Sequence, residues 1–265
     1  MTGLGIDIVT IIKKELEEVF RNKYILTTMA SFPLVFSIVI PLIYLFALPP
    51  NVTAADVATF KGLVAGSEGM EPRQILVAFI IQSNLSFYLM MPAVIPTVIS
   101  SYSIVGEKKC GTLEPLLATP VSTRDILMGK TLAAVIPSMA ITWLSFIIYA
   151  LLVDTVTFSI FGYPVVPDVL WLIALTVTAP LLAVMSVYMS IVVSSRMSDI
   201  RAAQQISAVF IIPLMSVFIL ELFGYMSLTI DLLLLISIAI GVADLFLIKA
   251  SVGVFRREEI LTGSA

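Results

Sequence analysis

Residues 75–105, ILVAFIIQSNLSFYLMMPAVIPTVISSYSIV, form a long run without a charged side chain. A membrane's hydrocarbon core, about 30 Å thick, is crossed by about 20 apolar residues in a helix. This run is longer than that, and Pro92 and Pro96 inside it each remove a backbone hydrogen bond. We therefore expect a membrane-spanning helix that tilts, bends or projects into water.

The composition of the whole chain also indicates a membrane protein. Of its 265 residues, 59% are hydrophobic and only 12% are charged, whereas soluble domains carry about 25% charged residues. Histidine is absent and Cys110 is the single cysteine. These counts exclude imidazole catalysis, a His-ligated metal site and an intrachain disulfide, so we expect no metal site. No stretch is basic and aromatic enough to predict a nucleic-acid partner.

Six apolar segments are long enough to cross a membrane, which predicts an all-α integral membrane protein with one domain over residues 1–265. The segments lie at about residues 27–48, 75–105, 131–153, 170–193, 206–223 and 230–250. Of the 15 basic residues, all but Lys61 and Arg73 fall on one side of these spans. The positive-inside rule then predicts a multi-pass protein of the cell membrane with both termini in the cytoplasm.

Residues 1–26, before the first span, predict an amphipathic helix on the cytoplasmic side. Apolar residues from Ile8 to Phe20 recur at three-and-four spacing, and charged residues lie between them. Such a helix lies in the membrane interface, in contact with lipid. It could be an anchor that sets the angle of the first span, or an arm that moves when a cytoplasmic partner moves.

The cytoplasmic loop of residues 106–130, GEKKCGTLEPLLATPVSTRDILMGK, carries most of the specific information. A glycine break precedes a short predicted helix, which Thr112 can cap and Thr119-Pro120 can end. Three leucines form one apolar face of that helix: Leu113, Leu116 and Leu117. This face must be buried against the membrane surface, the protein's own helices, or a groove on a cytoplasmic subunit.

This loop resembles the signature loop of type 2 ATP-binding-cassette (ABC) exporter permeases. The resemblance is carried by the order Glu-x-x-x-Gly-Thr-Leu-Glu-x-Leu-Leu-x-Thr-Pro-Val-Ser, with Gly-Lys at the head of the third span. The end of the chain, FRREEIL at residues 255–261, is also similar to the family's ending. The short connection at residues 224–229 is more like the smaller bacterial and archaeal branches than those with a longer re-entrant element there.

The resemblance implies a permease subunit that pairs with a second copy or a paralogue and docks two ABC ATPase subunits. It implies that the short helix is a coupling helix, which transmits ATPase motion to the spans. The residues that match the motif and are thereby expected to couple to the ATPase are Glu107, Gly111, Thr112, Leu113, Glu114, Leu116, Leu117, Thr119 and Pro120.

A nucleotide site on this chain is not expected. Gly129-Lys130-Thr131 looks like the end of a phosphate-binding loop, but Arg124 stands where that motif needs its first glycine, and no strand precedes it. We therefore expect a non-enzymatic permease without a cofactor of its own, with ATP and Mg²⁺ bound by the partner ATPase.

Several polar residues fall inside the predicted spans. Gln82, Asn84 and Ser86 either make hydrogen bonds between helices or line a substrate path. Asp244 is expected to form an ion pair with Lys130 or with an arginine of the 196–201 loop; a proton relay is the alternative. Glu221 and Asp231, at the outer ends of their spans, are expected to be solvated.

Three classes of function were compared. The favoured one is the permease of an ATP-driven exporter, moving a lipophilic or amphipathic substrate because the spans are mostly apolar. The alternative is an ion-gradient-driven secondary transporter, whose repeated halves commonly carry matching polar breaks; the two halves of this chain do not match. A membrane-embedded enzyme is disfavoured, since the chain offers almost no candidate nucleophile or metal ligand set.

Overall fold

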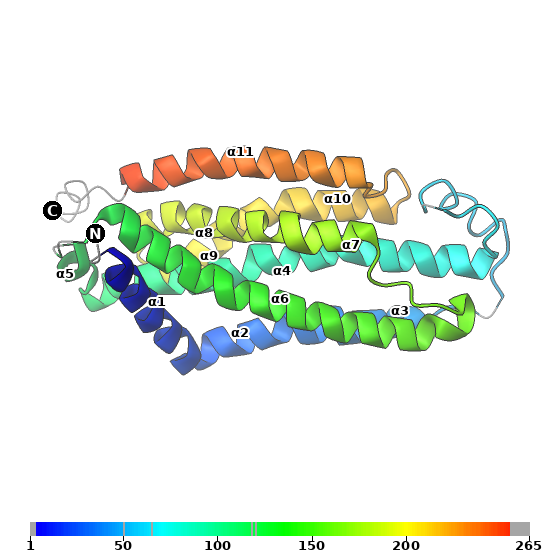
Figure 1. The fold of residues 1–265 in the computed structure, drawn as a ribbon, viewed down its shortest axis with the longest axis horizontal. Coiled ribbons are helices and arrows are strands. Elements are labelled where there is room, and N and C mark those ends of the chain that lie inside the picture. Colours follow the sequence, from blue (N-terminus) through cyan, green and yellow to red (C-terminus); the bar gives the residue numbers. More distant parts are fainter. Residues whose placement is uncertain (1–3, 50, 65, 118, 120, 255–265) are drawn as a thin grey trace.

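In the computed structural model, residues 4–49, 51–64, 66–117, 119 and 121–254 are described, and their regular elements are all helices. These run along one another in an elongated bundle (Figure 1), so the all-α prediction is confirmed for these residues. In chain order the elements are α1 (Leu4–Arg21), α2 (Lys23–Leu34), the π-helix η1 (Val35–Val39), α3 (Ile40–Phe46), α4 (Pro72–Cys110), α5 (Leu113–Leu117), α6 (Thr123–Phe161), α7 (Val169–Ile173), the π-helix η2 (Ala174–Thr178), α8 (Ala179–Arg196), α9 (Ile200–Ala208), the 3-10 helix η3 (Val209–Ile211), α10 (Ile212–Leu222) and α11 (Ile230–Val254).

Five helical stretches of the described chain are long and apolar enough to cross a membrane. They are Lys23–Phe46, Pro72–Cys110, Thr123–Phe161, Val169–Arg196 and Ile230–Gly253. The predicted span at residues 206–223 is not one straight helix: α9 and α10 meet at a bend of 44°, and they make a sixth span only if counted together. Pro213, at the start of α10, accounts for the break because it cannot donate to the preceding turn.

The two longest helices, α4 and α6, extend well beyond the apolar segments that the sequence delimits. Each has 39 residues, which at about 1.5 Å per residue is nearly twice the thickness of a hydrocarbon core. The predicted loop of residues 106–130 is correspondingly shorter, because α4 continues to Cys110 and α6 begins at Thr123. Ser122 caps α6 by accepting a hydrogen bond from the Asp125 backbone N–H at 3.2 Å.

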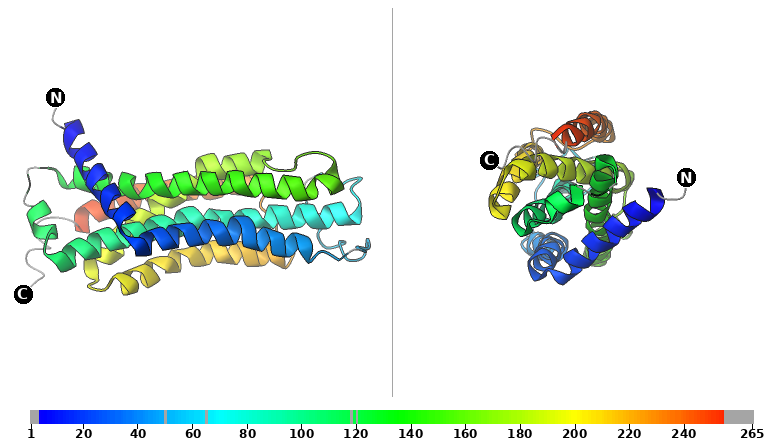
Figure 2. Two further views of the ribbon diagram at one scale, coloured as in Figure 1. Left: turned by 90° about the horizontal axis from the view of Figure 1, so that it is seen from below. Right: turned by 90° about the vertical axis from the view of Figure 1, so that its left-hand side faces the viewer.

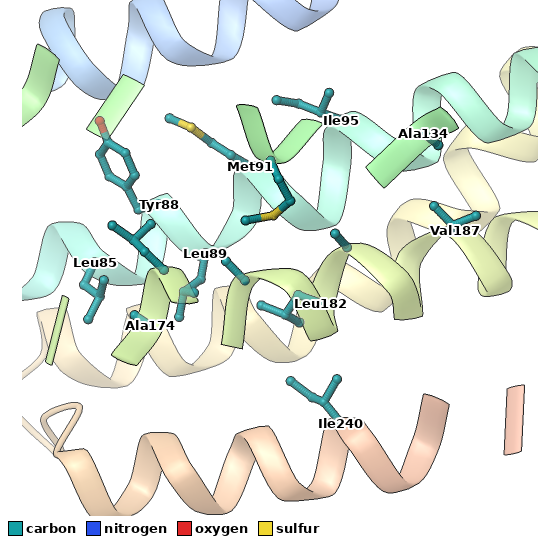
Figure 3. Close-up of a cluster of buried hydrophobic side chains, with 14 of the residues drawn as sticks. Leu85, Tyr88, Leu89, Met91, Ile95, Ala134, Ala174, Leu182, Val187 and Ile240 are labelled. Atoms are coloured by element: carbon teal, nitrogen blue, oxygen red, sulfur yellow. The ribbon is translucent and has the colours of Figure 1, made fainter. Parts of the chain in front are cut away.

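Helix α4 lies at the centre of the packing, with most of its residues buried. Figure 3 shows Leu85, Tyr88 and Met91 of α4 among side chains from α6, α8 and α11. The largest buried side chain, Trp171 of α7, has its ring centroid 5.3 Å from that of Tyr88. By contrast, outward residues such as Leu144 and Ile238 are apolar and exposed, as expected of a surface that faces lipid.

The start of α1, the helix α5 and the end of α11 lie at one end of the bundle, called here the α5 end (Figure 1). Helix α1 leaves the bundle axis at an angle there (Figure 2). At the opposite end the segment after α3 folds back: Val57 and Val64 pack with Ile75 and Phe79 of α4. The placement of α1 in a membrane interface stays a prediction.

Candidate functional site at the base of the α5 loop

Helix α4 stops at a glycine and passes directly into α5. Gly111 has the left-handed φ of 67° that favours glycine, and the Thr112 N–H donates to the Glu107 carbonyl at 2.9 Å. The Thr112 hydroxyl also donates to that carbonyl, at 3.3 Å. It therefore faces back toward α4, whereas the prediction was that it accepts from an N–H of the short helix as its cap. Its own carbonyl accepts from the Leu116 N–H at 3.1 Å, as at the start of a helix.

Helix α5 is held against the protein's own helices. Leu113 is buried in the main core, and Leu116 packs against that core while Thr119 donates its hydroxyl to the Leu116 carbonyl at 2.7 Å. Pro115 is exposed. The protein's own helices therefore cover two of the three leucines, Leu113 and Leu116. The side chains of Glu114 and Leu117, and the residue Pro120, lie outside the described part of the chain.

Directly beneath α5 lies a cluster of charged side chains, named here the Lys130 cluster, which comprises Lys14, Glu15, Ser103, Glu107 and Lys130. The Lys130 ammonium donates to Glu15 Oε1 at 2.6 Å and to the Ser103 hydroxyl at 2.7 Å. It also lies 2.8 Å from Glu107 Oε2 as an ion pair. Ser103 donates in turn to Glu15 Oε2 at 2.6 Å, and Lys14 donates to Glu107 Oε1 at 2.6 Å.

Three charges of this cluster are removed from water, since the side chains of Glu15, Glu107 and Lys130 are 4%, 5% and 3% exposed, whereas Lys14 is 46% exposed. Burial alone raises the pKa of Glu15, but Lys130, the Ser103 hydroxyl and Lys14 outweigh it, so that pKa lies below its ordinary value of 4.5. Burial lowers the pKa of Lys14, yet its bond to Glu107 and the nearby carboxylates leave that pKa raised. Both groups are therefore held in their charged forms.

The cluster joins three elements at the base of the α5 loop. Glu107 precedes α5 on α4, Lys130 follows it on α6, and Glu15 belongs to α1. The Glu107–Lys130 pair thus closes the base of the loop, and Glu15 ties that base to the N-terminal helix. A shift of α5 therefore cannot move α4 alone without disturbing the salt bridge between Glu107 and Lys130.

Gly129 lets α1 approach α6 closely next to the same ion pairs. A Cβ atom added at Gly129 would lie 2.7 Å from Ile11 Cγ2 and 3.0 Å from Ile11 Cβ. These carbon–carbon distances are shorter than a normal van der Waals contact, so α1 or the Ile11 side chain would have to move. The Gly-Lys pair of the sequence motif therefore has a local explanation here. Its glycine admits Ile11, and its lysine binds Glu15.

Sequence reasoning missed Glu15, Lys14 and Ser103 as partners of the loop. The signal was present for Glu15: it stands four residues after Ile11 and four before Val19, on the apolar stripe of the predicted amphipathic helix. A carboxylate in such a position requires a buried cation or hydrogen-bond donor. Which cation it is depends on the tertiary packing.

Two polar residues of the second span, Gln82 and Ser86, make hydrogen bonds to other parts of the bundle. Gln82 donates to the Leu228 carbonyl at 3.1 Å, and Ser86 donates to Glu221. Glu221 also accepts from the Leu228 N–H at 2.9 Å. The prediction that Glu221 is solvated is therefore wrong: it is 1% exposed, because α10 packs against α4. Asn84 is buried, and its Oδ1 has no hydrogen-bond partner among the described residues.

Asp244 does not form the ion pair that was predicted with Lys130. Lys130 is engaged by Glu15 and Glu107 instead. Asp244 is 4% exposed, and within the described part of the chain neither of its carboxyl oxygens has a hydrogen-bond partner.

Asp231 is exposed, in agreement with the prediction for that residue. The described residues also contain no group of His, Cys, Asp and Glu side chains suited to a metal ion.

These features define a multi-pass helical membrane protein with a short helix held at one end by buried ion pairs. Residues 9–253 match the family described as ABC-2 family transporter protein, and the chain belongs to that family. It is thus a membrane permease of an ABC transport system, and membership implies partnership with ABC ATPase subunits. No curated protein matches the chain.

Lys130→Met is expected to lower the free energy of unfolding by about 3–5 kcal/mol, because it leaves buried carboxylates without their cation. Thermal or denaturant unfolding of the purified permease in detergent measures the change. The double variant Lys130→Met/Glu15→Gln should recover part of the loss. As a control, Lys109→Met removes a lysine whose pair with Asp199 is exposed and 3.8 Å long; exposed pairs contribute little. Equal losses in the two lysine variants would contradict the assignment.

Gly129→Ala is expected to destabilise the protein by about 1–3 kcal/mol, the usual cost of overpacking, because α1 must move away from α6. A double-mutant cycle with Ile11→Ala measures the contact. The loss caused by Gly129→Ala should be smaller when residue 11 is alanine, since the methyl group nearest the new Cβ is then absent. Strict additivity of the two losses would show that Ile11 does not lie over Gly129 in the folded protein.

Proposed function

We propose that this chain is the permease subunit of an ATP-driven exporter and that α5 receives the motion of an ABC ATPase. The observation that carries the proposal is the Lys130 cluster, which connects both ends of the α5 loop to α1. An ATPase that displaces α5 would shift α4, α6 and α1 together, because Leu113 and Leu116 hold α5 on the bundle and the ion pairs hold its base.

The proposed assembly has two permease subunits, as two copies or as a copy and a paralogue, and two ATPase subunits. ATP and Mg²⁺ belong to the ATPase subunits, and this chain is proposed to be non-enzymatic by itself. The substrate is proposed to be lipophilic or amphipathic, since most residues of the spans are apolar. The α5 end is proposed to face the cytoplasm, with both termini.

An ion-gradient-driven transporter is the second candidate, and one observation favours it. Asp244 is a buried carboxyl group in α11 whose oxygens have no hydrogen-bond partner among the described residues, and buried intramembrane acids serve ion and proton pathways in such proteins. Reconstitution separates the two candidates. Substrate transport by liposomes that contain only this permease and are given a proton gradient would favour the ion-gradient-driven transporter. Transport that occurs only with the ATPase and nucleotide would favour the ATP-driven exporter.

Leu117→Asp is expected to weaken ATPase binding roughly thirtyfold, the effect of losing one central apolar contact in an interface, and to abolish ATP-dependent transport. The yield of membrane-inserted permease should be unchanged. Co-purification with the partner ABC ATPase measures the binding, and transport is followed in proteoliposomes. Leu117→Met is the matched control, because it keeps an apolar side chain of similar volume. Full transport by Leu117→Asp would count against a coupling role for α5.

The orientation can be tested with the native sequence, because Cys110 is the single cysteine and is exposed at the α5 end. A membrane-impermeant maleimide should label Cys110 in inside-out vesicles and leave it unlabelled in intact cells. The reversed control is Cys110→Ser combined with Ala54→Cys, which moves the thiol to an exposed position at the opposite end. Labelling of Cys110 from outside would invert the proposed topology.

A further inference from the structure

A groove toward the α5 end, separate from the Lys130 cluster, lies between the start of α6, the middle of α8 and the end of α11. Its volume is about 600 Å³. Its lining combines apolar side chains with two basic residues: Arg124, Leu127, Met128, Tyr188, Ile248, Lys249, Val252 and Gly253. None of these residues belongs to α5 or to the ion pairs beneath it.

The two basic residues of the groove are available to a ligand. Arg124 and Lys249 are exposed, and within the described part of the chain neither takes part in a salt bridge or a side-chain hydrogen bond. The described lining contains no carboxylate. Asp125, the neighbour of Arg124, is turned to the helix cap, where Ser122 donates to it at 2.6 Å. The groove therefore carries net positive charge, which an anion would neutralise.

Tyr188 adds a hydroxyl group to this lining. It is only 6% exposed, and its hydroxyl makes no hydrogen bond to another described residue. Its oxygen is not one of the fully buried side-chain atoms that lack a partner, so the hydroxyl is reachable from the groove, where a ligand can accept its hydrogen bond. Together, Arg124, Lys249 and Tyr188 can supply donors to phosphate oxygens, as arginine and lysine commonly do.

The groove lies where the apolar surface of the bundle gives way to charged ends. On α11, Leu245 and Phe246 are 63% and 69% exposed, and Lys249 follows within one turn. On α6, Met128 is 51% exposed, and Arg124 precedes it by one turn. On both helices, exposed apolar residues are thus followed by a basic residue toward the α5 end. This change from apolar to basic surface is typical of the depth at which phospholipid headgroups lie.

We propose that this groove binds an anionic phospholipid. Its phosphate would be held by Arg124 and Lys249 with Tyr188 as a further donor, and the upper parts of its acyl chains would lie along the apolar lining formed by Leu127 and Ile248. The lipid would bridge the beginning of α6, directly after the α5 loop, to the end of α11. Assignment to the inner leaflet rests on the proposed orientation, whereas the binding site itself does not.

Native mass spectrometry of the full-length permease in detergent tests the proposal, with phosphatidylglycerol and phosphatidylcholine of the same acyl chains as probes. The permease should retain phosphatidylglycerol in preference to phosphatidylcholine. Each basic residue close to an anionic lipid strengthens binding by roughly fivefold, so Arg124→Gln/Lys249→Gln should lower phosphatidylglycerol retention by roughly ten- to thirtyfold. Tyr188→Phe should lower it by a smaller factor.

Two matched variants make the result specific. Arg196→Gln/Arg201→Gln removes the same two charges from exposed positions at the same end, outside the groove, and should retain phosphatidylglycerol as the parent does. Gly253→Phe keeps both charges and fills the groove, because a Cβ at Gly253 meets no atom within 4 Å; it should displace the lipid. This variant also keeps the test decisive if the double charge variant fails to fold.

Several outcomes would overturn the proposal. These are equal retention of the two lipids by the parent protein, unchanged retention in both Arg124→Gln/Lys249→Gln and Gly253→Phe, or an equal loss in the Arg196→Gln/Arg201→Gln control. Displacement of the lipid by millimolar inorganic phosphate would show that the groove takes a free anion and not a lipid. Each of these results is independent of whether the permease is driven by ATP.

Discussion

The buried ammonium of Lys130 is the constraint on which the architecture of the α5 end depends. A lysine that is 3% exposed must be compensated, because moving a charge out of water costs several kcal/mol in a real protein. Compensation comes from carboxylates on two different helices and from a serine on one of them. The helices α1, α4 and α6 therefore cannot adopt independent positions at this end, and the short helix α5 inherits their arrangement.

This arrangement bears on the proposed coupling role of α5. A five-residue helix has little stability by itself, so it transmits motion only if its neighbours hold it firmly. Leu113 is buried in the core, the Thr112 hydroxyl is bonded to the end of α4, and Gly111 allows the abrupt change of direction between them. The proposed coupling would thus depend on both the apolar contacts of α5 and the ion pairs at the base of its loop.

The same physical rule applies to the polar groups within the bundle. Glu221 of α10 accepts hydrogen bonds from Ser86 of α4 and from the Leu228 N–H just before α11, and Gln82 binds the carbonyl of Leu228, so this acid is buried with hydrogen bonds. Asp244 is equally buried but has no such partners among the described residues. The contrast separates an acid whose burial is explained by its hydrogen bonds from one whose burial is not.

Most of the architecture could be predicted because it follows from local properties of the chain. The length of the apolar runs gave the membrane-spanning helices, the glycine and prolines around α5 marked its limits, and the order of residues in the loop indicated the family. Helix boundaries were less accurate: α4 and α6 continue past their apolar segments, since helices do not need apolar residues to extend into water, and Pro213 broke the span that hydropathy alone presents as continuous.

The sequence by itself determined that this chain is an all-helical membrane protein, because hydrophobicity and charge are properties of single residues and short runs. Only the tertiary structure decided that Lys130 pairs with Glu15 and Glu107 and not with Asp244, and that Glu221 is buried. It also decided that Arg124 and Lys249 share one groove. The residues of such pairs lie far apart in the sequence, up to 135 residues for Ser86 and Glu221. No periodicity or spacing encodes a contact that arises only when separate helices pack.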